Sequence, residues 1–165
     1  MRVYLPSTLP ALRGLLDTGE VGHPPLPGYA VTPALREWYS EGNEEELEYA
    51  ALSLAAKASV RLLDADQDAV RRRVVVVVDV PEAVVDAAAH VDRAAVKVTA
   101  QVPLAQVQAV HVDDPAAIDD VTVAADAVVA ADLGSEDAGF QVEQAEGHEL
   151  QWYATQEIGP LLELS

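Results

Sequence analysis

Five consecutive valines, Val74 to Val78, constrain the fold of this chain more than any other stretch. The run follows three arginines and ends at Asp79, so it is much shorter than the ~20 apolar residues of a membrane-spanning helix. Five β-branched residues without polar alternation are typical of a strand buried on both faces. We therefore expect the valine run to be the central strand of a sheet.

The residues after this strand argue against a nucleotide-binding turn. A phosphate cradle needs glycines where a strand turns into a helix, and DVPEAVVDAAA has none. Asp79 and Glu82 instead place carboxylates where phosphate would lie. We expect a short helix at Glu82–Ala89 and a second strand at Ala95–Gln101, arranged as a minimal strand–helix–strand crossover.

Length and composition predict one globular domain. The chain has 165 residues, of which 50% are hydrophobic, which is enough for a substantial core. It has no cysteine, which excludes disulfides, thiol nucleophiles and thiolate zinc sites and suits a reducing compartment. The N-terminal sequence contains no long apolar targeting segment, so we expect a cytoplasmic protein.

The charge restricts the partners. A net charge of −18 repels nucleic acids and anionic membranes, so neither is expected as a partner. Arg71, Arg72 and Arg73 form the only basic cluster, and we expect them to be solvated or paired with surface acids at the start of the strand. Arginine outnumbers lysine, which is typical of a GC-rich genome.

Hydrophobic periodicity and turn residues predict the other elements. Strands are expected at Arg2–Leu5, Val107–Asp113 and Leu150–Ala154, and a loop at Gly22–Gly28. Four further helices are expected. The first has Leu9, Leu12 and Leu16 inward, and the second starts at Thr32. A long helix at Asn43–Leu63 is expected to turn inward Leu47, Ala51, Leu54, Ala58 and Leu62, and a helix at Ala116–Ala131 is expected to turn inward Ile118, Val121, Ala125, Val128 and Val129.

Leu133–His148 is expected to be mostly loop, with a short edge strand at Gly139–Gln144 as the alternative. The complete pattern predicts a single α+β domain in which helices pack on a mixed sheet of four to five strands.

Two Trp-Tyr pairs, Trp38-Tyr39 and Trp152-Tyr153, hold half of the aromatic residues. If the first helix packs on the last strand, the two pairs can line one ligand pocket. The polar partners would be Arg36, Glu37, Gln151 and Gln156. In the alternative interpretation, the tryptophans fill the core and the tyrosines reach outward to water.

A weaker candidate is a metal site. A strand at Val107–Asp113 places His111 and Asp113 on one face, where both could bind one cation, although a third ligand is not evident. Glu44 and Glu48 are one helical turn apart and could bind a cation, but acids at a helix start also complement its dipole. We prefer to interpret the first pair as polar residues on the exposed face of a strand end. We expect no cofactor.

Several stretches carry a resemblance over most of the chain. They are MRVYLPSTLPAL, YAVTPALREWY, EELEYAALSLAA, HVDDP and LQWYATQEI. Together the chain resembles a family of small acidic actinobacterial proteins of unknown function. The resemblance implies a cytoplasmic protein of a GC-rich bacterium rather than of a halophile, and it implies no catalytic residue.

The leading functional hypothesis is a non-enzymatic protein-interaction or regulatory domain, because no nucleophile, cofactor or metal signature stands out. Its partner would be a protein, and the acidic charge favours a basic face on that partner. The alternative is a small-molecule-binding protein or an enzyme with a pocket near the two Trp-Tyr pairs.

Overall fold

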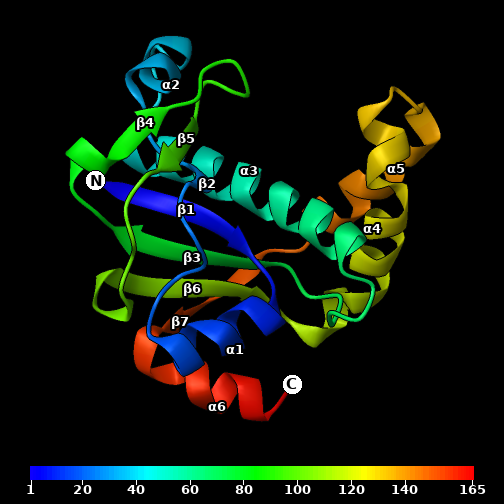
Figure 1. Ribbon diagram of the computed structural model, residues 1–165. Helices are drawn as coiled ribbons and strands as arrows, with labels where there is room; N and C mark the ends of the chain where they lie inside the picture. The colour runs from blue at the N-terminus through cyan, green and yellow to red at the C-terminus, as the bar shows by residue number, and fades with distance from the viewer.

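A single antiparallel sheet organises the structure, a computed structural model that describes residues 1–165 (Figure 1). Seven strands lie in the order β4-β5-β2-β1-β3-β6-β7. Their bounds are β1 (Arg2–Ser7), β2 (Leu26–Tyr29), β3 (Val74–Asp79), β4 (Val85–Ala87), β5 (Ala95–Val98), β6 (Val107–Asp113) and β7 (Leu150–Ala154). The α+β class is confirmed. The expectation of a mixed sheet with four to five strands is wrong, because all neighbours are antiparallel and two short strands join the sheet.

The valine run forms β3 and is buried on both faces, as predicted. Val74, Val76 and Val78 join the main core on one face, while Val75 and Val77 pack on the other. The run is an interior strand beside β1, and β1 holds the middle position in the sheet order. Burial on both faces removes the alternation of polar and apolar residues that a half-exposed strand shows.

The expected crossover after the valine run is wrong. Glu82–Val84 forms one 3₁₀ turn and Val85–Ala87 forms β4, which pairs with β5. Two strands, β2 and β1, separate β5 from β3. The short segment gains more from ladder hydrogen bonds to β5, extended by the bond from Ala88 N–H to Ala95 O (2.8 Å), than from one isolated helical turn.

The other additional strand, β2, begins inside the segment expected to be a loop. Gly28 allows this strand to approach β1 closely, because a Cβ at this position would lie 2.8 Å from side-chain atoms of Leu5 and Val3. A proline- and glycine-rich sequence thus forms a strand where only glycine fits against the neighbouring chain.

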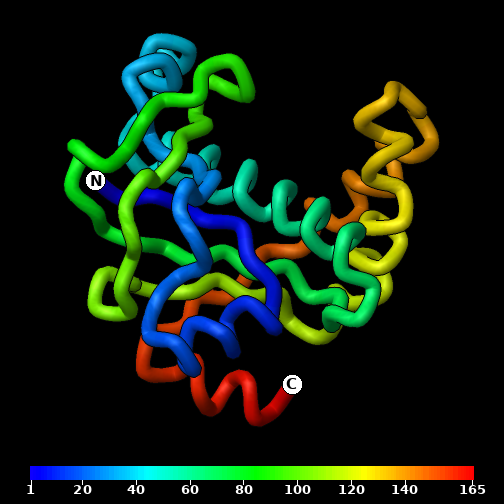
Figure 2. Tube along the Cα trace, viewed as in Figure 1, coloured from blue at the N-terminus to red at the C-terminus, as the bar shows by residue number.

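Two helices, α1 (Leu9–Thr18) and α6 (Ile158–Glu163), lie side by side on one face of the sheet (Figure 2). The side chain of Thr8 caps α1 by accepting a hydrogen bond from Ala11 N–H (3.3 Å). Leu9, Leu12 and Leu15 of α1 are buried, whereas Leu16, expected inward, is 39% exposed. These two helices and the sheet enclose the largest core cluster.

The long helix α3 (Glu44–Ala65) crosses the opposite face of the sheet, and the short helix α2 (Pro33–Trp38) precedes it. Asn43 caps α3 as predicted. The predicted inward stripe is partly wrong, because Leu62 is exposed and the helix contacts its neighbours through a different stripe. The buried residues are Leu47, Ala51, Ala55, Ala56, Ser59, Val60 and Leu63. Small side chains in this set let the helix lie close to the strands.

Helices α4 (Ile118–Asp132) and α5 (Glu136–Glu146) form a hairpin that packs on the C-terminal part of α3 and stands away from the sheet (Figure 1). The prediction of α4 is confirmed, although Val129 is exposed rather than inward. The prediction of mostly loop at Leu133–His148 is wrong. Ser135 caps α5, and the helix buries Ala138, Val142 and Ala145 at helical spacing.

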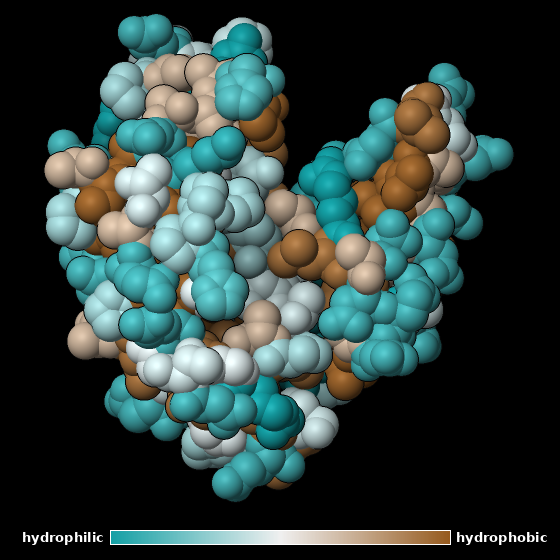
Figure 3. Space-filling model, viewed as in Figure 1, coloured by the Kyte–Doolittle hydropathy of each residue, from teal (hydrophilic) through white to brown (hydrophobic).

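Figure 3 shows a hollow between this hairpin and the body of the molecule, with hydrophobic residues on the hairpin. The hairpin exposes Val129, Leu133 and Phe140. None of the helices has both the length and the apolar character needed to cross a membrane.

Candidate functional site

Two adjoining cavities lie between α3 and the end of the sheet formed by β6 and β7. Their volumes are about 490 and 510 Å³. Both are lined by Tyr49 and Leu52 of α3, His111 of β6 and Trp152 of β7. Because they share these four side chains, the two cavities adjoin each other, and we call them together the α3–β7 groove.

The two ends of the groove are polar. Arg2, Glu45, Glu48 and Gln108 line one end. The other end is lined by Lys57, Arg73, Glu146, His148 and Glu149. The middle is mostly apolar and aromatic, with Tyr49 and Trp152 exposing 58% and 61% of their surface. The arrangement suits a ligand with an apolar middle and polar flanks.

His111 lies in the floor of the groove and is half-buried. Alternation along β6 sends Val110 and Val112 into the main core, while Ala109 and His111 line the groove. Burial lowers the pKa of the His111 imidazole below its ordinary value of 6.5, because desolvation penalises the charged ring. At neutral pH the ring is therefore uncharged and offers one donor and one acceptor.

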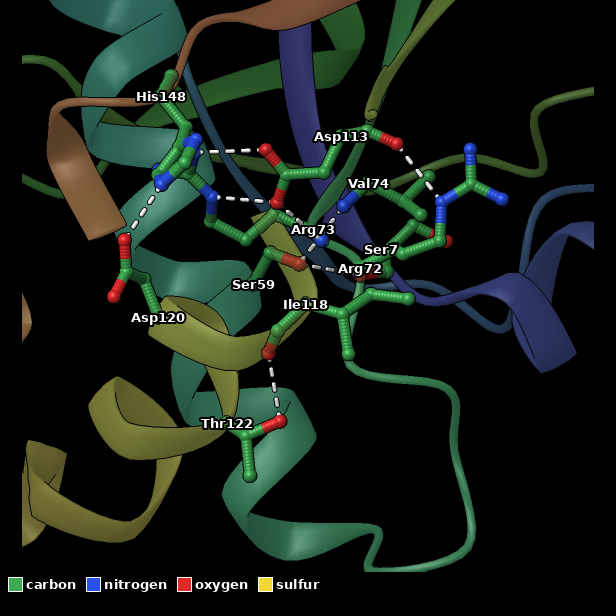
Figure 4. A network of polar contacts seen from close by, with 10 residues as sticks. All are labelled: Ser7, Ser59, Arg72, Arg73, Val74, Asp113, Ile118, Asp120, Thr122 and His148. Carbon is green, nitrogen blue, oxygen red and sulfur yellow. Dashed lines mark hydrogen bonds and ion pairs between the residues drawn. The ribbon is translucent and has the colours of Figure 1, made fainter. Parts of the chain in front are cut away.

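Asp113 lies two residues from His111 and is fully buried in an ion pair with Arg73 (Figure 4). The guanidinium donates from Nε to Oδ2 and from Nη2 to Oδ1, each at 2.8 Å. The backbone N–H of Arg73 also donates to Oδ2 at 2.8 Å. Both carboxylate oxygens are thus engaged by arginine, which leaves them poorly placed to bind a cation together with His111.

The chain contains no cluster of three or more side chains that could hold a metal ion. Glu44 and Glu48, the other candidate ligands, form ion pairs with Arg36 (2.8 Å) and Arg2 (3.1 Å) respectively. The metal pair His111–Asp113 stays a prediction from the sequence.

The three arginines before the valine run are not a solvated cluster, which corrects the sequence-based expectation. Arg72 and Arg73 are 5% and 3% exposed. Arg72 Nε donates to Asp113 O (2.8 Å). Arg71 donates to the carbonyl oxygens of Leu63 (2.6 Å) and Asp66 (2.9 Å), and so caps the C-terminal end of α3.

His148 connects this buried pair to α4. Its carbonyl oxygen accepts a hydrogen bond from Arg73 Nη2 (2.8 Å), and its Nε2 lies 2.7 Å from Asp120 Oδ2 (Figure 4). One end of the α3–β7 groove is therefore fixed by contacts among β3, β6 and the helical hairpin.

The two members of the pair Trp152-Tyr153 point to opposite faces of β7. Trp152 lines the groove, whereas Tyr153 packs against the main core and donates from Oη to Gln151 Oε1 (3.1 Å). Gln151 is exposed, and so is Gln156 in the turn after β7. Only Trp152 of this pair contributes to the groove.

Trp38 and Tyr39 line another cavity of about 520 Å³, which adjoins the Lys57 end of the groove through Tyr49, Ser53 and Leu54. The guanidinium of Arg93 lies 3.7 Å from the centre of the Trp38 ring, and Tyr49 lines both this cavity and the groove. Arg36 pairs with Glu44 and lines a further cavity, and Glu37 is exposed. The structure thus places the two tryptophans in different cavities rather than in one pocket.

Sequence reasoning missed most of the groove. The missed residues are Tyr49, Leu52, Lys57, Arg73 and His148. One signal was available in the sequence. Leu52, Ser53, Ala56 and Lys57 follow Tyr49 by three, four, seven and eight residues, which places all five on one face of a helix.

Comparison with known proteins identifies one relationship. A family model described as "Family of unknown function (DUF6912)" matches residues 1–162. Neither the curated proteins nor the solved structures contain a match. The match confirms the resemblance to a family of unknown function over the length of the chain. The chain therefore belongs to the family of unknown function DUF6912.

Proposed function

We propose that this protein is a non-enzymatic interaction domain that binds an extended segment of another protein in the α3–β7 groove. The observation that carries the proposal is the pair of adjoining cavities that share Tyr49, Leu52, His111 and Trp152. Two adjoining cavities with polar outer ends suit a segment of chain better than they suit a compact ligand.

The exposed aromatic side chains support this proposal. Tyrosine and tryptophan are enriched at the centres of protein interfaces, where they carry much of the binding energy. Tyr49 of α3 and Trp152 of β7 both line the groove and are each more than half exposed. Half-exposed aromatic rings that border the same depression present apolar area that a partner can cover.

The uncharged ring of His111 supplies a polar group at the floor of the groove. It can donate one hydrogen bond and accept one, without the cost of covering a charge. A peptide group of the partner has the matching donor and acceptor.

We also propose a cytoplasmic location in a GC-rich, actinobacterial host. The absence of cysteine and the excess of arginine over lysine support this assignment.

The test is a selection from a displayed library of short linear peptides against the immobilised protein. A parallel selection uses the double variant Tyr49→Ser/Trp152→Ser to remove peptides that bind elsewhere. Enrichment of related sequences on the wild-type protein alone is the expected result. Equal enrichment on both proteins, or no enrichment on either, would contradict the proposal.

A second candidate function is the binding of a small molecule at the Lys57 end of the groove. The observation that favours it is the cavity of about 510 Å³, which lies within the usual range of small-molecule sites and is bordered by Lys57, His148 and Trp152. A thermal-shift screen with metals, nucleotides, coenzyme A compounds and common metabolites tests this function. A compound that raises the melting temperature of the wild-type protein, but not of Trp152→Ser, would support it.

A further inference from the structure

The strand β7 forms one edge of the sheet and pairs only with β6. Proteins usually protect such edges with prolines, lysines, bulges or very short strands. The opposite edge follows this rule, because β4 has only three residues and exposes Asp86. The five residues of β7 include no proline, no charged side chain and no register shift, and Trp152 is exposed at their centre.

The register of β6 shows which backbone groups of β7 are free. In an antiparallel ladder, successive residues direct their N–H and C=O groups alternately to the two neighbouring strands. Asp113 N–H donates to Arg73 O (3.1 Å), so the groups of Asp113 point toward β3. By alternation, those of Val112 and Val110 point toward β7.

Val112 and Val110 pair with Gln151 and Tyr153. The backbone groups of these two residues are therefore used within the sheet, and those of Trp152 between them point outward from the edge. At the end of β7, Ala154 N–H is already bound to Glu157 Oε1 (2.9 Å). The open positions on the edge are thus next to the groove, at Leu150 and Trp152.

We infer that the partner segment adds to β7 as a further strand of the sheet and places an apolar side chain beside Trp152, with basic side chains flanking it. This inference rests on the proposed binding function and specifies how the partner is held. A residue opposite Trp152 lies on the same face of the sheet as Trp152, so its side chain enters the α3–β7 groove. Main-chain hydrogen bonds supply affinity and the groove selects the side chain.

The charges around the groove favour a basic partner. Glu45, Glu146 and Glu149 border the groove without an ion-pair partner, while Arg2 and Arg73 are paired within the protein. Lys57 is the remaining cation, so the acidic groups are in excess. A second copy of this chain fits poorly as the partner, because it would bring another net charge of −18 to the interface.

Amide hydrogen exchange, followed residue by residue by NMR, tests the added strand. The probe is a linear peptide enriched in the selection on the wild-type groove. In the free protein, the amides of Gln151 and Tyr153 should be protected by β6, and the amide of Trp152 should exchange rapidly. With the peptide bound, the exchange of Trp152 should slow by ~tenfold or more. A Trp152 amide that stays rapid in the complex would overturn the inference.

Backbone methylation of the same peptide provides an independent readout. If the peptide pairs with β7, methylating alternate amides should abolish binding, whereas the amides between them should tolerate it. If the loss of binding depended only on which side chain lies next to the methylated amide, and did not alternate along the peptide, strand addition would be contradicted. Binding that is strengthened when the lysines and arginines of the peptide are replaced by glutamate would contradict the basic partner.

The outcomes separate the two proposals. If the selection yields no groove-dependent peptide, the proposed function fails, and the inference fails with it. If a peptide binds in the groove but leaves the Trp152 amide rapid, only strand addition fails. A protein that elutes as a dimer on gel filtration, with a protected Trp152 amide before any peptide is added, would identify a second copy as the occupant and overturn the basic partner.

Discussion

Arg73 and Asp113 form a bidentate ion pair that is almost completely excluded from solvent, with their side chains 3% and 0% exposed. The pair joins the start of β3 to the end of β6, and Arg73 also holds the carbonyl oxygen of His148. These contacts fix the end of the α3–β7 groove that is lined by Lys57 and His148. A buried pair of this kind adds little net stability by itself, but the loss of one partner leaves a buried charge without compensation.

The substitution Asp113→Ala should therefore lower the free energy of unfolding by about 3–5 kcal/mol. Chemical denaturation followed by circular dichroism measures this loss. Asp126→Ala is the matched control, because Asp126 is exposed on α4 and takes part in none of the ion pairs. The control should change the stability by less than about 0.5 kcal/mol. Equal effects of the two substitutions would contradict the structural role of the pair.

Val76 tests the interior position of β3. It is 1% exposed, and truncation to alanine removes two methyl groups from the main core. We expect a loss of about 1–3 kcal/mol from the transfer of these groups and the cavity left behind. Val123→Ala, at a valine that is 44% exposed on α4, serves as the control. An unchanged melting temperature of Val76→Ala would exclude the buried placement.

Ser59 lies on the buried stripe of α3 and connects this helix to two strands. Its hydroxyl group donates to Ser7 O (2.8 Å) and accepts from Val74 N–H (3.1 Å). Ser59→Ala should cost about 1–3 kcal/mol, because the substitution leaves both backbone groups buried without a partner. Ser53→Ala, at an exposed serine of the same helix, should be nearly neutral in the same denaturation experiment. A destabilisation by Ser53→Ala that equals that of Ser59→Ala would contradict the assignment.

His111 makes a specific contribution to the pH dependence of stability. Its pKa is lower in the folded protein than the ordinary 6.5 of the unfolded chain, so the unfolded state binds more protons between these two values. The stability that His111 contributes to the folded protein is therefore fully present above pH 6.5. It is lost as the pH falls through the lowered pKa of the folded state.

Unfolding free energies of the wild-type protein and of His111→Gln, measured across this range, isolate that contribution from the many carboxylates. As the pH falls below 6.5, the free energy of unfolding of the wild-type protein should decrease relative to that of His111→Gln. A difference that is independent of pH would show that His111 titrates normally in the folded state.

Local patterns in the sequence predict the strongly patterned parts of this fold. The cap at Asn43 and the five predicted strands, the valine run among them, depend on residues that lie next to one another in the sequence. The structure confirms the cap and forms a strand at each of the five places. The two missed strands depend on tertiary pairing. Gly28 is favourable in β2 only because β1 passes close to it, and β4 forms only because β5 is available.

The helix α5 was missed for a different reason. Its sequence is polar and includes Gly139, so its helical signal is limited to three small or β-branched residues at helical spacing. Packing against α4 stabilises the helix, and a single sequence does not contain that contact.

The candidate site shows the same limit. His111 and Trp152 were identified from the sequence and lie in one groove, but Asp113 is engaged by Arg73, which is 40 residues away along the chain. Spacing within one segment cannot reveal such a pairing. The alternation of side chains along a strand does imply that Trp152 and Tyr153 face opposite sides, so their separation could have been predicted.

The central claim is that the α3–β7 groove, and not exposed aromatic surface in general, binds the partner. Trp152 and Trp38 allow a matched comparison, because they are 61% and 62% exposed and lie in different cavities. The most direct measurement is the affinity of a selected peptide for Trp152→Ala and for Trp38→Ala by isothermal titration calorimetry. We predict that Trp152→Ala weakens binding by about tenfold or more, while Trp38→Ala leaves it unchanged. Equal losses in the two variants, or unchanged binding to Trp152→Ala, would contradict the account.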